Sequence, residues 1–140
     1  MKRATVWLRG GYYYHIEPQG SFVAGGFWGP NSEDLLRIRQ ELAADSEPLQ
    51  KIIQAPLFQE YFGELLGRKL KTAPRGFAKD HPNIDFLRYK QYLVKRTFTD
   101  KEVLAKDFQD EVVKTFRAMR PYFDFMSETL TTDLNGVAIY

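Results

Sequence analysis

The fold is decided by residues 3–28, RATVWLRGGYYYHIEPQGSFVAGGFW, in which β-branched and aromatic residues alternate with turn formers. The β-rich runs lie at about residues 3–9, 12–17 and 21–28. Gly10-Gly11 and Pro18-Gln19-Gly20 separate them, and both patterns are typical of tight turns between antiparallel strands. The stretch therefore predicts an antiparallel meander. Within its third run, Gly25-Gly26 indicates a bulge or a close approach of another backbone.

Downstream of the meander the apolar residues recur at helical spacing. Helices are expected at about residues 33–44, 48–54, 82–90 and 107–130, and a further strand at 91–98. The last helix carries the longest apolar stripe, formed by Phe108, Val112, Phe116, Met119, Phe123, Met126 and Leu130. Because Pro121 cannot donate a backbone hydrogen bond, this helix is expected to kink or break near Arg120. Thr99 and Glu102 match a capping box.

These elements predict an α+β fold. We expect an antiparallel sheet of about four strands that is packed by helices on one face and followed by the long C-terminal helix. The chain of 140 residues is expected to form a single domain, since 44% of its residues are hydrophobic.

Composition restricts the classes of function. The 20 Lys and Arg residues nearly balance the 18 Asp and Glu residues, so the net charge of +2 makes nucleic acid an unfavoured partner. The chain has no cysteine, which fits a reducing compartment and leads us to expect the cytoplasm. No apolar run approaches the roughly 18 residues of a membrane span, so we expect a soluble protein with no membrane partner.

A candidate site lies in residues 70–90, LKTAPRGFAKDHPNIDFLRYK. Pro74-Arg75-Gly76 is typical of a turn, and Asp80-His81-Pro82 is typical of a helix start. The N-terminus of a helix over 82–90 would direct backbone N–H groups at a loop that carries Arg75 and Lys79, an arrangement that attracts phosphate or carboxylate. The alternative is a capped turn, in which Asp80 caps the helix and the basic residues are only solvated. The ligand-binding candidates are Arg75, Gly76, Lys79, Asp80, His81 and His15.

The sequence leaves the question of catalysis open. His15 and His81 are the two histidines, and either could act as acid–base in a hydrolase-like enzyme in which Arg75 holds a substrate anion. Such an enzyme would need these residues and a carboxylate to converge in one pocket. No metal-ligand spacing, nucleophile motif or phosphate-binding loop is present, so neither a metal nor a cofactor is expected. The third alternative is an interaction module with no small ligand.

A second pattern bears on nucleic acid. Tyr89, Tyr92 and Phe98 interleave with basic residues, a mixture that could stack bases on an exposed strand. Aromatic residues at alternate strand positions more often belong to a core, so this pattern does not favour nucleic acid.

Three blocks resemble successive parts of one family: GGYYYHIEPQGSFVAGGFWGP, LKTAPRGFAKDHPNIDFLRYKQYLV and FRAMRPYFDFM. They are similar to the domain of unknown function 2461 (DUF2461), found as conserved hypothetical proteins in bacteria and fungi. The block from Pro74 to Pro82 is the most specific. The resemblance implies an α+β fold and brings no activity, substrate or cofactor with it.

The resemblance also implies a missing part. Similar proteins carry a further N-terminal region before the Gly-Tyr-Tyr strand, so residues 1–140 would correspond to the C-terminal part of such a domain. A sheet that lacks a covering layer exposes apolar surface, and self-association would bury that surface. We therefore expect a homodimer.

Overall fold

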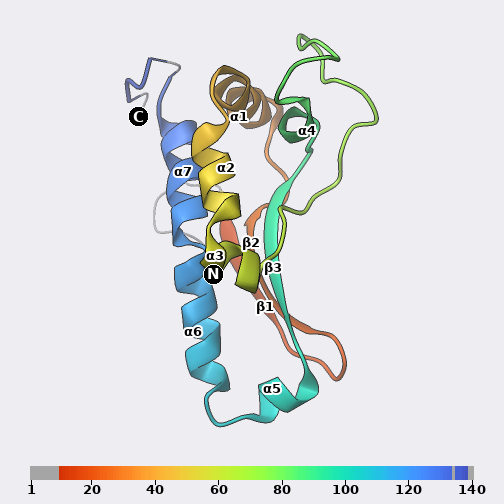
Figure 1. The fold of residues 1–140 in the computed structure, drawn as a ribbon, viewed down its shortest axis with the longest axis vertical. Helices are drawn as coiled ribbons and strands as arrows, with labels where there is room; N and C mark the ends of the chain where they lie inside the picture. The colour runs from red at the N-terminus through yellow and green to blue at the C-terminus, as the bar shows by residue number, and fades with distance from the viewer. Residues whose placement is uncertain (1–9, 134, 139–140) are drawn as a thin grey trace.

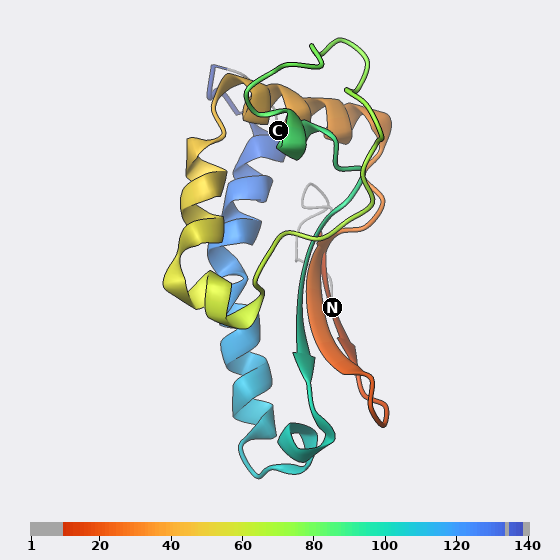
Figure 2. The same cartoon turned by 45° about the vertical axis from the view of Figure 1, so that its right-hand side comes forward.

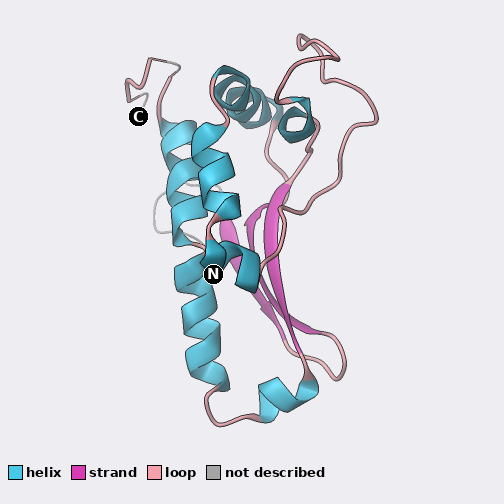
Figure 3. Ribbon diagram, in the orientation of Figure 1, coloured by secondary structure: helices cyan, strands magenta, loops and turns pink. Residues whose placement is uncertain are grey.

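The computed structural model describes residues 10–133 and 135–138 and has the expected mixed α and β composition. Its antiparallel sheet has the order β1-β2-β3 and comprises β1 (Gly11–His15), β2 (Ser21–Phe27) and β3 (Tyr92–Phe98). Figure 3 shows these strands side by side, with helices gathered beside and above them. The expected strand at residues 3–9 lies outside the described residues. The described part of the sheet thus has three strands, and a fourth is not confirmed.

The two turns of the meander have different outcomes. The second is confirmed, since Gly20 N donates to Glu17 O over 3.1 Å and Gln19 has a φ of +61°. The first is wrong, because Gly11 lies inside β1 opposite Gly26 and does not have the positive φ that a two-residue turn requires.

Gly25-Gly26 marks a close approach rather than a bulge. The register between β2 and β3 runs without interruption through both glycines, so no extra residue is inserted. Gly26 has a φ of +137°, and a Cβ at this position would lie 2.1 Å from Tyr92 O. The second alternative of the sequence analysis is therefore confirmed.

The helices cover one face of the sheet and its upper end. They are α1 (Ser32–Ala44), α2 (Glu47–Gln54), α3 (Pro56–Tyr61), α4 (Ile84–Leu87), α5 (Asp100–Leu104), α6 (Phe108–Ala118) and α7 (Arg120–Thr131). In Figure 2, α2, α3, α6 and α7 stand on one side of the strands, while α1 and α4 lie across the top. None of these helices lies on the opposite face of the sheet. Nor does any helix of the described chain have the length and apolarity needed to cross a membrane.

The C-terminal stripe forms the expected contact with the sheet. α6 ends at Ala118 and α7 begins at Arg120, so the break beside Pro121 is confirmed. Met119, at the junction, and Phe123 are both fully buried.

The capping box predicted at Thr99 and Glu102 is also present. The hydrogen bond that the Glu102 carboxylate accepts from the backbone N–H of Thr99 lowers the pKa of Glu102.

A polar cluster lies within the core where α1, α7 and β3 meet. Arg39 donates from Nε to Leu87 O over 2.8 Å and from a terminal nitrogen to Tyr89 O over 3.0 Å, and its partial burial lowers the pKa of the guanidinium. The hydroxyl of Tyr92 donates to Phe86 O over 2.9 Å. Tyr122 is fully buried, and its hydroxyl has no hydrogen-bond partner among the described residues. Burial raises the pKa of both Tyr92 and Tyr122 well above 10.

These two tyrosines predict a loss of stability in alkali. In the unfolded chain they lose their protons from about pH 10, whereas the folded protein holds them neutral to higher pH. The contribution of these two tyrosines to the free energy of unfolding is therefore fully present below pH 10. Above pH 10 the free energy of unfolding falls by about 1.4 kcal/mol per pH unit for each hydroxyl. Urea unfolding at pH 8, 10 and 11 measures this slope.

The matched variant is Tyr122→Phe, which removes one hydroxyl and keeps the ring. We expect it to retain the stability of the parent at pH 8 or to exceed it by about 1 kcal/mol, because the hydroxyl is buried without a partner among the described residues. Its slope above pH 10 should be about half that of the parent. Equal slopes in the two proteins would contradict a buried, neutral Tyr122.

Candidate functional site

The loop before α4 has a defined turn. It projects from the upper end of the molecule (Figure 1). Phe77 N donates to Pro74 O over 3.1 Å, and Pro74 is buried, so the loop is anchored at this point. Gly76 has a φ of +89°, a conformation that glycine adopts without a steric penalty. The turn predicted at residues 74–76 is confirmed.

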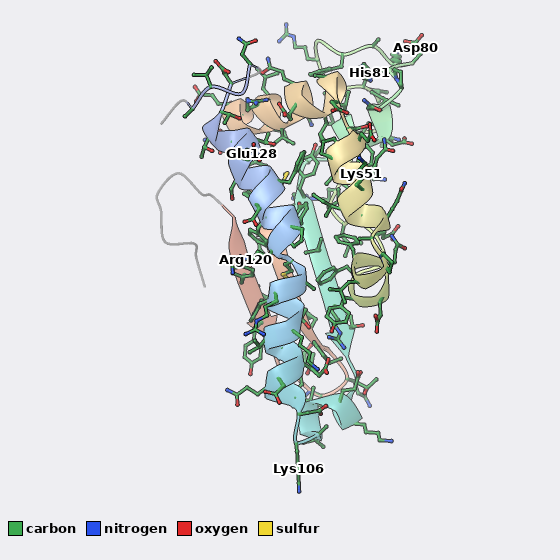
Figure 4. The ribbon with its side chains drawn as sticks, turned by 60° about the vertical axis from the view of Figure 1, so that its left-hand side comes forward. Lys51, Asp80, His81, Lys106, Arg120 and Glu128 are labelled. Carbon is green, nitrogen blue, oxygen red and sulfur yellow. The ribbon has the colours of Figure 1, made fainter. Side chains whose placement is uncertain are left out.

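The charged side chains of this loop point into solvent. Arg75, Lys79 and Asp80 are exposed, and none of them forms an ion pair with a described residue. Figure 4 shows Asp80 and His81 together on the loop, at the end of the molecule opposite Lys106. The loop therefore offers two cations and one carboxylate that can meet a ligand.

His81 is tied to the backbone at one ring nitrogen. Its Nδ1 accepts a hydrogen bond from Asn83 N over 3.0 Å, so the neutral ring carries its proton on Nε2. Asn83 is in turn held by Ser46 Oγ, which donates to Asn83 Oδ1 over 2.9 Å, and by Leu42 O, which accepts from Asn83 Nδ2 over 2.9 Å. This chain of hydrogen bonds connects the loop to the end of α1 and the start of α2.

The helix expected at residues 82–90 is much shorter than predicted. α4 spans only Ile84–Leu87, and Asp80 makes no cap to it. The reason is tertiary, because Leu70 N donates to Arg88 O and Lys90 N donates to Arg68 O, each over 2.7 Å. These bonds flank a β-bridge between Tyr89 and Lys69, so the helix does not continue past Arg88. A helix of one turn has little dipole, so the anion site loses the helix contribution that the sequence suggested.

His15 does not join the loop. It ends β1, beside the β1–β2 turn at the lower end of the sheet, whereas the loop of His81 lies at the upper end (Figure 1). The His15 Nε2 atom lies 3.4 Å from Glu17 Oε2, and its ring stacks on Tyr13 at 6.2 Å between centroids. The two histidines, Arg75 and a carboxylate therefore do not converge in one pocket within the described residues. These residues also contain no group of three or more His, Asp or Glu that could hold a metal ion.

Positive charge is concentrated in the sequence segment that contains the loop, although the total charge of the chain is small. Residues 66–96 hold nine Lys and Arg residues but only two Asp and Glu, a net charge of +7, so the other 109 residues carry −5. Five of the nine cations are exposed and make neither an ion pair nor a cation–π contact with described residues; they are Arg68, Lys71, Arg75, Lys79 and Lys90. We call these five residues the basic surface.

The face of the sheet that none of the described helices covers carries a row of aromatic rings. It consists of Tyr13 and His15 from β1, Phe22 from β2, and Trp28 just after β2, and we call it the aromatic face. The Tyr13 ring centroid lies 5.7 Å from that of Phe22 and 6.4 Å from that of Trp28. Beside these rings is a hollow of about 310 Å³, which Leu66, Leu93 and Lys95 help to line.

A second hollow is larger but apolar. It measures about 680 Å³ and lies between β1 and α6, where Tyr12, Tyr14, Val112 and Phe116 contribute to its lining. Among the described residues, no Lys, Arg, Asp or Glu side chain lines it. The described lining therefore offers no charged side chain that would select an anion.

Comparison with known proteins gives a family. The sequence model of the conserved hypothetical proteins called DUF2461 matches residues 2–125 of the 140. The chain belongs to this family. No curated protein and no solved structure matches the chain. The resemblance noted in the sequence is thus confirmed for this DUF2461 protein.

Sequence reasoning missed the aromatic face of this DUF2461 protein. It considered Tyr89, Tyr92 and Phe98 as stacking residues, but all three are buried. The exposed rings belong to the first two strands instead, with Tyr13 and Trp28 exposed by 48% and 41%. The alternation of Tyr13 with His15, and of Phe22 with Ala24, was the available signal, because alternate residues of a strand share one face.

Proposed function

We propose that the protein binds an anionic ligand through the loop of Arg75, Gly76, Lys79, Asp80 and His81 and the rest of the basic surface. The observation that supports this function is the net charge of +7 over residues 66–96, with five exposed cations that have no ion-pair partner among the described residues. A concentration of one charge sign raises the local concentration of ligands of the opposite sign. The first ligand class to test is phosphate-bearing molecules.

The loop residues have distinct parts in this proposal. Arg75 supplies a planar fork of donors that fits two phosphate oxygens, and Lys79 supplies a mobile point charge. Gly76 lets a phosphate approach the backbone, since it has no side chain and a Cβ there would meet no described atom within 4 Å. Asp80 opposes the anion, so neutralising it should strengthen binding. His81 positions the end of the loop through its bond to Asn83 N.

The test is the stabilisation of the protein by inorganic phosphate. At a phosphate concentration about ten times its Kd, the parent should gain about 1.4 kcal/mol in free energy of unfolding. The double variant Arg75→Ala with Lys79→Ala should lose most of this gain. Its stability without phosphate should stay within about 0.5 kcal/mol of the parent, because both side chains are exposed and form no ion pair with described residues.

The control removes the same charge elsewhere. Lys101→Ala with Lys106→Ala deletes two exposed lysines near α5, at the opposite end of the molecule (Figure 4). It should keep the phosphate effect. If the parent gains nothing from phosphate, or if both double variants lose the gain equally, the proposed site is wrong. A large loss of stability in Asp80→Ala would instead indicate a structural turn.

The hydrolase alternative has no comparable support among the described residues. It required His15 or His81 to meet Arg75 and a carboxylate in one pocket, and the two histidines lie near opposite ends of the sheet. The interaction-module alternative is supported by the uncovered aromatic face.

A further inference from the structure

We propose that the anionic ligand is single-stranded nucleic acid, with its bases stacked on the aromatic face and its phosphates along the adjoining cations. This inference rests on the proposed function, because the same basic surface supplies the attraction for phosphate. It adds a second ligand-binding feature, the exposed rings, for which a small inorganic anion has no use.

The aromatic face has the geometry of a stacking platform. Tyr13 and Trp28 are about half exposed, so part of each ring surface is accessible to a base. The rings of Tyr13 and His15 are nearly parallel, with an interplanar angle of 12°, and Phe22 lies 5.2 Å from His15 between centroids. Stacking of bases on rings of this kind tolerates any base, since every base has a π face.

Cations stand at two places along this row of rings. Lys95 places Nζ 5.1 Å from the centroid of Phe22, on the same face of the sheet. Near Trp28, the side chain of Gln91 connects two backbone segments, since it donates to Trp28 O over 2.8 Å and accepts from Arg68 N over 3.4 Å. Arg68 therefore lies next to Trp28. A strand whose bases cover the rings would bring its phosphates to Arg68 and Lys95.

The backbone fixes this neighbourhood. Leu66 exchanges two hydrogen bonds with Leu93, of 2.7 and 2.9 Å, and Lys69 forms a bridge with Tyr89, so residues 66–70 run from the start of β3 back along the residues that precede it. Gly67 allows the approach, because its φ is +145° and a Cβ there would lie 2.2 Å from Gln91 O. The cations of residues 68–71 are thus attached to the sheet that displays the rings.

Charge and ring exposure together favour nucleic acid over the other occupants of this face. A second copy of the chain would bring Arg68, Lys90 and Lys95 close to the same cations of its partner, which costs free energy. A free phosphate or polyphosphate would leave the rings uncovered. Duplex DNA or RNA keeps its bases stacked within the helix, whereas a single strand can splay them onto aromatic side chains.

The distribution of charge along the chain weakens the argument against nucleic acid that was drawn from the net charge. The net charge of +2 disfavoured nucleic acid because it averages a segment of +7 with a remainder of −5. Phosphate contacts respond to the local field, which falls off over about 10 Å in 0.1 M salt.

Fluorescence anisotropy of labelled oligonucleotides of roughly 12 nucleotides tests the proposal on the full chain. DNA and RNA strands of one mixed sequence, the matching duplex, and tripolyphosphate as a competitor are measured at several salt concentrations. We expect single strands to bind more tightly than the duplex. With three phosphates contacted, log K should fall with log salt at a slope of about −2.

The discriminating variants alter the rings and leave the charges. Tyr13→Ala with Trp28→Ala should weaken single-strand binding about tenfold or more and leave tripolyphosphate binding unchanged, since each stacked ring contributes appreciably to affinity. Tyr13→Phe with Trp28→Phe keeps an aromatic ring at both positions and should retain binding. Leu104→Ala, at a side chain that is 85% exposed on α5, is the control for an apolar surface change. Thermal unfolding confirms that each variant is folded.

The outcomes separate this inference from the proposed function. If oligonucleotide and tripolyphosphate bind equally to the parent and to the ring variant, the anion site stands and nucleic acid is the wrong ligand. If neither anion binds, both proposals fail together. If light scattering shows a dimer that Tyr13→Ala with Trp28→Ala dissociates, the aromatic face is a contact between copies, and the nucleic-acid proposal is overturned.

Discussion

Replacement of Phe123 by alanine should lower the free energy of unfolding by about 3–5 kcal/mol, the usual range for a buried phenylalanine. Phe123 is fully buried on α7, and its ring centroid lies 4.6 Å from that of Tyr12 and 5.7 Å from that of Phe27. It also fills the space above Gly25, where a Cβ would lie 2.9 Å from the ring. Truncation would therefore open a cavity between α7 and the strands β1 and β2. Urea unfolding measures the loss.

Phe116 provides the matched comparison on the same stripe. It is only partly buried and borders the hollow of about 680 Å³ between β1 and α6. Phe116→Ala should cost less than Phe123→Ala, about 1–2 kcal/mol, because less apolar surface leaves water there on folding. Equal losses in the two variants would mean that the stripe packs uniformly on the sheet, contrary to the burial of its members. A loss below about 1 kcal/mol for Phe123→Ala would remove α7 from the core.

Local sequence patterns were sufficient to predict the features that depend only on residues close together in the chain. The apolar stripe of α6 and α7, the break beside Pro121 and the capping box of Thr99 with Glu102 were all predictable, because each follows from residues close to one another in the chain. The pairing of β1 with β2 was predictable for the same reason, since these strands are consecutive and separated by a turn.

Tertiary contacts overrode the local pattern around α4. Residues 82–90 contain a helix start and apolar residues at helical spacing, yet Tyr89 is held in a β-bridge with Lys69, and hydrogen bonds join residues 88 and 90 to residues 70 and 68. No local feature of residues 66–70 identifies them as a partner for the edge of β3. The length of α4, and with it the loss of the helix contribution to the anion site, could be learned only from the structure.

The candidate site shows the same division. The turn at Arg75 and Gly76 was predictable from proline and glycine. The separation of His15 from His81 was not, because it depends on the tertiary fold, which places the end of β1 and the loop before α4 near opposite ends of the sheet. The aromatic face was the hardest part. Alternation assigns Tyr13 and His15 to one face and Tyr12 and Tyr14 to the other, but it does not tell which of the two faces the helices will cover.

The second large loss of stability is expected from substitution of a glycine in β2. Gly26 combines a φ of +137° with a backbone contact, since a Cβ would meet Tyr92 O at 2.1 Å. An alanine there can be accommodated only if β2 moves away from β3 or changes its backbone conformation, and either change breaks hydrogen bonds between these strands near the end of β2. We therefore expect Gly26→Ala to cost about 3 kcal/mol or more.

Two other glycines separate the causes of that loss. Gly63 has a φ of +72°, and a Cβ added there would meet no described atom within 4 Å, so Gly63→Ala isolates the backbone strain and should cost about 1 kcal/mol. Gly29 has neither a positive φ nor a close neighbour among the described residues, and Gly29→Ala should be tolerated. If the contact with β3 dominates, denaturant unfolding should rank the losses as Gly26, then Gly63, then Gly29. A loss at Gly26 no larger than that at Gly63 would mean that β2 and β3 can separate at little cost.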